Sequence, residues 1–232
     1  MAHPPTVLIT GGSGLIGRAL AVRLPADGYR PVPLVRPKDG TPPANGPWWD
    51  PPSGSIVLEP AGSLRSVIHL AGAGIADRSW TKARKAVLRE SRVETTRLLA
   101  TALAELPEDR RPESLVMASG IGIYGDRGEE ILTEESEPGE GFLADLARDW
   151  EAAAEPARAA GIRVVAVRLG MVLSLEGGAL AKMHLPFRLG LGGPLGGGHQ
   201  YVSWISLPDA VSIFATLIGR EDVSGPVNAV AP

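Results

Sequence analysis

The stretch TVLITGGSGLIGRAL, residues 6–20, decides the fold. Its first five residues, TVLIT, form a short apolar run with the length and composition of a buried strand. Residues 15–24, LIGRALAVRL, carry apolar side chains at helical spacing, and Gly28 marks the end of this helix. A strand, a glycine-rich turn and a helix in immediate succession predict the first unit of a parallel α/β sheet.

Three glycines in the turn predict a phosphate-binding site. Gly11, Gly14 and Gly17 form a G-x-x-G-x-x-G run between the strand and the helix. The first glycine lets the chain turn sharply, the second lets the backbone approach a phosphate, and the third lets the helix pack closely on the sheet. Free main-chain N–H groups and the helix dipole favour a pyrophosphate at this place. The alternative is a glycine-rich turn that binds nothing.

The rest of the chain repeats the alternation of strand and helix. Further strands are expected over residues 31–35, 55–58, 66–70, 114–118, 163–169 and 227–230, helices over 79–106, 142–160 and 208–218, and loops over 36–54 and 190–198. This order predicts an α/β protein of the Rossmann type, with a doubly wound parallel sheet and helices on both faces.

Composition excludes several classes of protein and site. The 232 residues carry a net charge of −3, so no basic field attracts nucleic acid or an anionic membrane surface. The absence of cysteine excludes disulfides and thiolate ligands, and the four scattered histidines predict no metal site. No apolar run reaches the roughly 18 residues of a membrane span. The first ten residues do not resemble an export signal, which predicts a cytoplasmic protein.

The residues after the second predicted strand favour NADP(H) over NAD(H). An acidic residue near this position holds the ribose 2′-hydroxyl of NAD(H), whereas an arginine accommodates the 2′-phosphate of NADP(H). Here Arg36 and Lys38 follow the strand, and no acidic residue precedes Asp39. The alternative is that Arg36 is a solvated loop cation.

Seven segments resemble the extended short-chain dehydrogenase/reductase superfamily and, within it, the sugar-nucleotide-epimerase-like branch. They are TGGSGLIG (10–17), HLAG (69–72), RSWTKARKAVLRESRVETTRLL (78–99), SGIGIYGDRG (119–128), DWEAAA (149–154), VRLGMVLS (167–174) and KMHLPFRLGLGGPLGGGHQYVSWI (182–205). The resemblance implies an NADP(H)-binding Rossmann domain over residues 1–170 and a partial substrate lobe over residues 171–232, interleaved with the last sheet elements. Members of this branch usually carry a further C-terminal domain of unknown function.

The resemblance also implies which residues contact NADP(H). These are Gly11, Ser13, Gly14, Leu15, Ile16, Gly17, Arg36, Leu70, Ala71, Gly72, Arg92 and Val172.

The usual catalytic pair of this superfamily is absent. Its members use a tyrosine and a lysine four residues later to move a proton while hydride is exchanged with the nicotinamide. No lysine stands four residues after any of the three tyrosines. Ser119 and Tyr124, which follow the strand expected over residues 114–118, are the remaining candidates for catalysis. The alternatives are a tyrosine ring packed in the turn and a serine that only hydrogen-bonds the cofactor or a backbone group.

The segment over residues 182–205 is expected to cover a substrate cleft. Lys182, Gln200 and Trp204 are candidates for binding a small polar substrate such as a nucleotide sugar, and His184 lies nearby. The alternative for Lys182 is a position on a surface helix. Two functions stay open: an NADP(H)-dependent oxidoreductase or epimerase, and a non-catalytic NADP(H)-binding redox sensor or interaction module.

Two further features have a structural alternative. His69, at the end of a core strand, is expected to be structural. Trp48 and Trp49 are expected either to flank an adenine pocket or to pack over the edge of the sheet.

Overall fold

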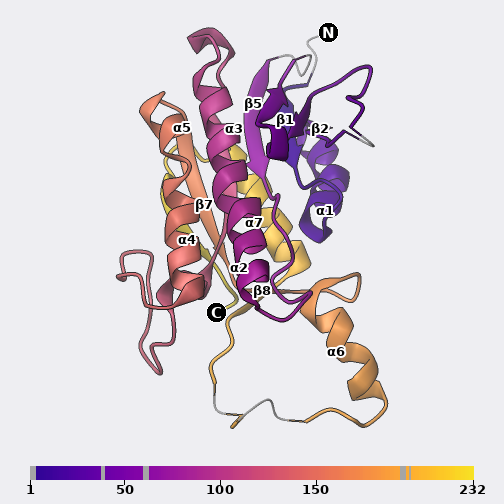
Figure 1. Ribbon diagram of the computed structural model, residues 1–232, viewed down its shortest axis with the longest axis vertical. Coiled ribbons are helices and arrows are strands. Elements are labelled where there is room, and N and C mark those ends of the chain that lie inside the picture. Colours follow the sequence, from indigo (N-terminus) through magenta and orange to yellow (C-terminus); the bar gives the residue numbers. More distant parts are fainter. Residues whose placement is uncertain (1–3, 38–39, 60–62, 194–196, 199) are drawn as a thin grey trace.

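A six-stranded sheet, in which all neighbouring strands are parallel, forms the centre of the protein. The computed structural model describes residues 4–37, 40–59, 63–193, 197–198 and 200–232. In spatial order the strands are β10 (Gly225–Ala229), β7 (Arg163–Leu169), β6 (Ser114–Gly120), β5 (Leu64–His69), β1 (Thr6–Thr10) and β2 (Arg30–Pro33). The winding direction reverses between β1 and β5 (Figure 1). The predicted doubly wound parallel sheet is confirmed.

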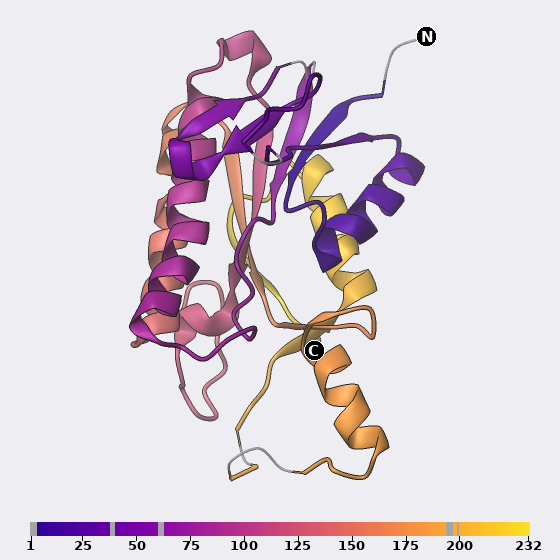
Figure 2. The same ribbon diagram turned by 45° about the vertical axis from the view of Figure 1, so that its right-hand side comes forward.

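Helices cover both faces of this sheet (Figure 2). One face is covered by α1 (Leu15–Arg23) and α7 (Leu207–Gly219), and the other by α2 (Lys82–Arg89), α3 (Thr95–Ala104), α4 (Phe142–Ala152) and α5 (Glu155–Ala159). All five residues of β1 are buried. A strand covered on both faces needs an apolar run rather than an alternating pattern, which explains why TVLIT is a strand.

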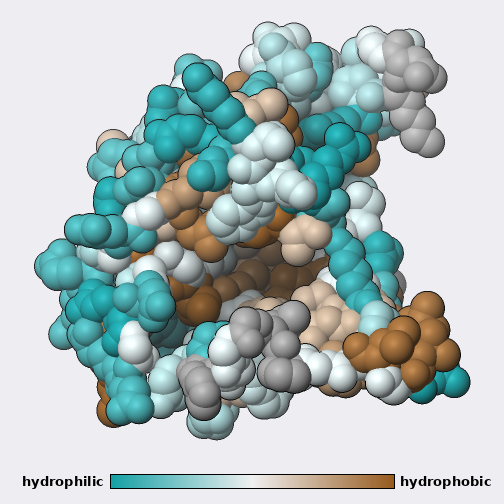
Figure 3. Space-filling model, turned by 60° about the horizontal axis from the view of Figure 1, so that its bottom comes forward, coloured by the Kyte–Doolittle hydropathy of each residue, from teal (hydrophilic) through white to brown (hydrophobic). Residues whose placement is uncertain are grey.

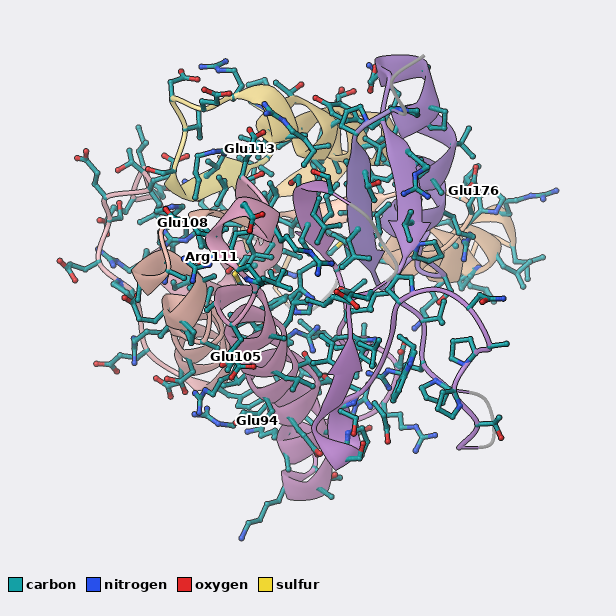
Figure 4. All side chains as sticks on the ribbon, turned by 90° about the horizontal axis from the view of Figure 1, so that it is seen from above. Glu94, Glu105, Glu108, Arg111, Glu113 and Glu176 are labelled. Carbon is teal, nitrogen blue, oxygen red and sulfur yellow. The ribbon has the colours of Figure 1, made fainter. Side chains whose placement is uncertain are left out.

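Arg111 joins two helices at the end of the molecule where the strands begin (Figure 4). Its guanidinium donates to the carbonyl oxygens of Leu106 at 3.0 Å, Ala104 at 3.0 Å and Ala160 at 2.9 Å. These carbonyls lie at the carboxyl ends of α3 and α5, where no helical N–H is available to them. One side chain therefore completes the hydrogen bonding of two helix ends.

Two predicted helices are interrupted. The helix expected over residues 79–106 consists of α2, a π-helical turn over Glu90–Glu94, and α3. The helix expected over residues 142–160 is divided into α4 and α5. Pro156 lies in the first turn of α5, because proline has no N–H for the preceding helix but fits the start of a new one.

The prediction of a loop over residues 36–54 was wrong for the last part of this range. Residues there form β3 (Trp48–Asp50), which pairs antiparallel with β4 (Ser55–Val57) across a turn that ends at Gly54 with φ +70°. The hairpin extends the edge of the main sheet, since Trp48 forms a parallel bridge with Val35 just beyond β2. Tryptophan is common in strands, but the prolines and glycines around Trp48 and Trp49 favoured the prediction of a loop.

Residues 171–232 contribute to two parts of the structure. Strands β8 (Met171–Leu173) and β9 (Trp204–Ser206) pair in parallel, and α6 (Gly178–Arg188) between them extends away from the sheet (Figure 1). The chain then returns through α7 to β10 in the main sheet. A domain division at residue 170 stays a prediction. Among the described residues, no helix has the length and apolar character needed to cross a membrane.

Candidate functional site

The candidate site lies at the edge of the sheet where the parallel strands end. Figure 3 views the molecule from this side and shows a hollow with hydrophobic residues at its bottom. Ligands of doubly wound sheets bind outside the carboxyl ends of the strands, where the winding reverses. In this chain the reversal separates β1 from β5, so the segments that follow these two strands form the centre of the site.

The glycine-rich turn forms a narrow cradle at the start of α1. The N–H of Gly14 donates to the carbonyl oxygen of Gly11 at 2.9 Å, and no side chain caps the helix. The first turn of α1 contains no acidic residue. The N–H groups of residues 15–17 have no partner inside the helix, as in the first turn of any α-helix. These donors and the positive end of the helix dipole suit a phosphate.

Two glycines of the cradle are required by close backbone contacts. A Cβ atom on Gly17 would lie 2.5 Å from the carbonyl oxygen of Gly11. A Cβ atom on Gly11, where φ is +67°, would lie 2.8 Å from the carbonyl group of Leu70. The cradle therefore packs directly against the end of β5, which brings Leu70 and Ala71 beside the glycines.

His69 holds the ends of β1 and β5 together. Its ring nitrogens lie 2.7 Å from Oγ1 of Thr10 and 2.9 Å from Oγ1 of Thr96. The same Thr10 hydroxyl accepts hydrogen bonds from the main-chain N–H groups of Leu70 and Ala71. Complete burial lowers the pKa of His69 to about 3, so the ring is neutral at physiological pH. The structure gives this histidine the structural role that the sequence favoured.

Arg36 lies at the far side of the cradle, beyond β2. It is exposed, and its Cζ atom is 5.9 Å from the ring centroid of Trp49. The Trp49 side chain is 1% exposed and meets the His69 ring edge-on at 5.9 Å. Trp49 therefore packs inside the sheet edge, and Arg36 lies over it. Lys38 and Asp39, also used in the cofactor prediction, are outside the described residues.

Arg92 reaches the site from the π-helical turn. Its side chain is 7% exposed, and a Cβ atom on Gly72 would lie 3.3 Å from its Cζ atom. The guanidinium lies over the Trp150 ring, with Cζ 5.1 Å from the centroid. Burial, followed by the charge of Arg84, lowers the pKa of Arg92 to about 10, which leaves it protonated at neutral pH. Arg92 and Gly72 thus lie together.

Val172 joins the site through the turn that follows β8. Cβ atoms on Gly177 and Gly178 would contact the Leu15 side chain at 3.7 and 3.8 Å. The carbonyl oxygen of Val172 lies 3.4 Å from the Cβ position of Gly178. Val172 is therefore placed near the first turn of α1.

Ser119 and Tyr124 belong to one buried polar network. The Ser119 hydroxyl donates to Oε1 of Glu151 at 2.6 Å, and the Tyr124 hydroxyl donates to Oδ1 of Asn228 at 2.6 Å. Arg168 connects the two halves: it forms a double hydrogen bond with Glu151, both at 2.9 Å, and donates to the Tyr124 oxygen at 2.8 Å. Ser119 is 4% exposed and Tyr124 is 3% exposed.

The charge of Arg168 is stabilised within this network. Burial by itself lowers the pKa of Arg168, but the hydrogen bonds and charge of Glu151, with the bond to Tyr124, raise it above its ordinary value. A permanent positive charge therefore lies 2.8 Å from the Tyr124 hydroxyl oxygen.

The substrate candidates do not meet at one point. Gln200 and Tyr124 line the same cavity of about 830 Å³, between the segment over residues 121–132 and the end of β10. Lys182 instead faces the loop after β5, where its Nζ atom lies 3.0 Å from Oδ1 of Asp77 and 3.2 Å from the carbonyl oxygen of Ala76. Trp204 is 46% exposed in β9. His184 is exposed on α6.

Sequence reasoning missed several polar residues of the site. Glu151, Arg168 and Asn228 complete the network around Tyr124, and Arg84 donates to the carbonyl oxygen of Gly74 near Arg92. Arg168 could have indicated this network, because it is a charged residue inside a strand predicted to be buried. Among the described residues, no group of three or more histidine or acidic side chains could hold a metal ion.

Comparison with protein families and known proteins gives one consistent result. Residues 7–229 match the NAD dependent epimerase/dehydratase family. An epimerase family protein of Mycobacterium tuberculosis, MT2273, is 41% identical over 228 residues, covering 97% of this chain and 73% of the relative. The human epimerase family protein SDR39U1 is 38% identical over 231 residues, covering 97% of this chain and 74% of the relative.

Two solved structures are similar over nearly the whole chain. Human SDR39U1 (isoform 2), solved with NADPH, has a TM-score of 0.83 and 34% identity, and the match covers 98% of this chain and 74% of the human chain. A nucleoside-diphosphate sugar epimerase of Corynebacterium glutamicum has a TM-score of 0.82 and 40% identity. The present chain, 99% of which is matched, spans 47% of that longer chain.

Proposed function

Since the chain belongs to the NAD-dependent epimerase/dehydratase family, we propose that it binds NADP(H) and acts as an oxidoreductase or epimerase on a small polar substrate such as a nucleotide sugar. The observation that carries this proposal is the cradle at the start of α1. Its glycines leave no room for a Cβ atom at Gly11 or Gly17, and its helix N-terminus has no capping side chain.

The residues of the cradle fit a dinucleotide. Main-chain N–H groups of Leu15, Ile16 and Gly17 would hold the diphosphate, and Arg36 would meet the 2′-phosphate of the adenine ribose. Leu70, Ala71 and Gly72 directly follow β5, and the first two lie beside Gly11 of the cradle. The human relative was solved with NADPH, which agrees with this assignment. When bound, the nicotinamide supplies or accepts a hydride.

Tyr124 is the candidate for moving the proton that accompanies hydride exchange. Tyr124 lines the cavity of about 830 Å³ that Gln200 also lines. Arg168 donates to the hydroxyl oxygen at 2.8 Å and fixes the position of this hydroxyl. Ser119 acts through Glu151 as a positioning residue for Arg168.

A second function is favoured by a specific observation: the hydroxyl groups of this network already have hydrogen-bond acceptors within the protein. The hydroxyl protons of Ser119 and Tyr124 are both donated to side chains of the protein, and both residues are nearly inaccessible. A chain of this kind would bind NADP(H) without turnover and serve as a redox sensor or an interaction module.

One set of measurements distinguishes the two functions. Calorimetry with NADPH tests the cofactor, and absorbance of NADPH during incubation with carbonyl compounds and nucleotide sugars tests turnover. The enzyme function predicts turnover that Tyr124→Phe abolishes while NADPH affinity is retained. Binding of NADPH with no turnover on any substrate supports the sensor. Turnover that survives in Tyr124→Phe removes the role given to Tyr124.

A further inference from the structure

Two arginines near the loop after β5 have unsatisfied hydrogen-bond donors. Among the described residues, the buried side-chain nitrogen and oxygen atoms without a hydrogen-bond partner are Nε of Arg84 and Nε of Arg92. A buried donor without an acceptor is unfavourable, and more so when the group is charged. Two such atoms on neighbouring guanidiniums point to a ligand that supplies the missing acceptors.

Both guanidiniums pack against the same three residues, 72–74. Arg84 donates through Nη2 to the carbonyl oxygen of Gly74. The Cζ atom of Arg92 lies 3.3 Å from the Cβ position of Gly72. The Arg92 side chain also turns back toward the start of its helix, because its Nη1 atom donates to the carbonyl oxygen of Leu88 at 3.3 Å. This direction brings it toward the turn that carries Arg84.

The π-helical turn contributes to this arrangement. Glu90–Glu94 is a five-residue π-helical segment between α2 and α3, and Arg92 lies at its centre. An extra residue in one helical turn rotates the side chains that follow relative to those before it. Such insertions occur frequently at functional sites.

Acidic groups near the two arginines compensate their charges only in part. Asp77 lies close to Gly74, where its carboxylate would contact a Cβ atom, and its charge interacts with that of Arg84, but its ion pair is with Lys182 at 3.0 Å. In the described part of the chain, no ion pair joins Arg84 or Arg92 to a carboxylate. The two positive charges repel each other, and the charge of Arg84 contributes to the lowered pKa of Arg92. An anion between them would remove this repulsion.

We propose that Arg84 and Arg92 form a two-arginine site for a phosphoryl group, a phosphate or diphosphate, beside residues 72–74. Guanidinium groups bind phosphate oxygens through paired, charge-assisted hydrogen bonds, and their Nε–H is one of the donors that take part. The site lies next to the cradle, because Gly11 contacts Leu70 and Ala71 at the start of the same loop. The phosphoryl group comes either from NADP(H) or from a nucleotide substrate, so this inference rests on the proposed function.

Calorimetry on the full chain separates these sources. Three probes are titrated: NADPH, inorganic pyrophosphate, and UDP added to the NADPH-saturated protein. Arg84→Gln is the main variant because Arg84 is only half-buried, and Arg92→Gln is the second. Arg89→Gln is the matched control: Arg89 ends the same helix, is 50% exposed and pairs with Asp149. Melting temperature and circular dichroism establish that each variant is folded.

Loss of an arginine donor to a phosphate is expected to weaken binding about tenfold or more, while Arg89→Gln changes it less than about twofold. Weaker binding of NADPH in Arg84→Gln assigns the site to the cofactor. Unchanged NADPH binding with weaker UDP binding assigns it to the substrate. If wild-type protein binds pyrophosphate through these arginines but does not bind NADPH, the site stands and the proposed function fails. If NADPH binds and no probe is weakened in folded Arg84→Gln, the inference is wrong and the proposed function is unaffected.

Discussion

Replacing Gly17 by alanine tests the cradle at its tightest point. The new Cβ atom would lie 2.5 Å from the carbonyl oxygen of Gly11 and 2.7 Å from Cα of Gly12. Both are backbone atoms of the turn, so the turn itself must move to restore normal contact distances. Alanine is favoured over glycine in a helix by about 1 kcal/mol, but overpacking of this kind costs about 1–3 kcal/mol. We expect the free energy of unfolding to fall by up to about 2 kcal/mol.

For a chain of this size, that loss lowers the melting temperature by up to about 8 °C. The larger effect is expected on cofactor binding, because the displaced turn carries the N–H groups that hold the diphosphate. Loss of one hydrogen bond to a charged group weakens binding about ten- to a hundredfold. Calorimetry with NADPH measures this change, and thermal unfolding measures the stability.

The matched control is Gly12→Ala in the same turn. A Cβ atom at Gly12 would meet only Cβ of Pro33, at 3.7 Å, which is an ordinary contact. The melting temperature of this variant should therefore equal that of the wild type. If Gly17→Ala keeps both its melting temperature and its NADPH affinity, the reasoning from the glycine contacts is refuted.

Three further predictions follow from other parts of the structure. Arg36→Ala should weaken NADPH binding about tenfold and leave NADH binding unchanged; equal weakening of both cofactors would contradict the role of Arg36. Arg168→Met should lower the free energy of unfolding in urea by about 3–5 kcal/mol, because it leaves Glu151 buried without its partner; a loss below about 1 kcal/mol would show that the ion pair contributes little. The folded-state pKa of His69, about 3, lies below its unfolded value of 6.5, so the unfolded chain takes up the proton first and stability falls as the pH drops from 6.5 toward 3. Relative to His69→Gln, the wild type should lose about 1.4 kcal/mol per pH unit between pH 6 and 4 in urea unfolding, and parallel pH profiles would count against this explanation.

The strands of the central sheet could be predicted because burial on both faces imposes a simple pattern. TVLIT in β1 and RVVAVRL in β7 are largely apolar runs, which are typical of strands buried on both faces of the sheet. The glycine cradle could be predicted for a similar reason: its spacing reflects backbone contacts between residues close in sequence. The contact of Gly11 with Leu70 was consistent with that prediction, although 59 residues separate the two.

The remaining features depend on contacts between distant segments. The π-helical turn leaves no periodic signal, because it adds a single residue to one turn of an otherwise regular helix. The β3–β4 hairpin lies in a stretch rich in proline and glycine, and its place is set by the pairing of Trp48 with Val35. The partners of Tyr124 come from β7 and β10, so neither Arg168 nor Asn228 could be assigned to it by spacing.

Nuclear magnetic resonance of uniformly ¹⁵N-labelled protein tests most directly whether main-chain N–H groups at the start of α1 hold a dinucleotide diphosphate. NADPH should shift the amide signals of Leu15, Ile16 and Gly17 among the largest changes in the spectrum, with saturation at the affinity found by calorimetry. NADH should shift the same signals but saturate at a higher concentration. Amides of α1 that stay unchanged at millimolar NADPH would contradict the account.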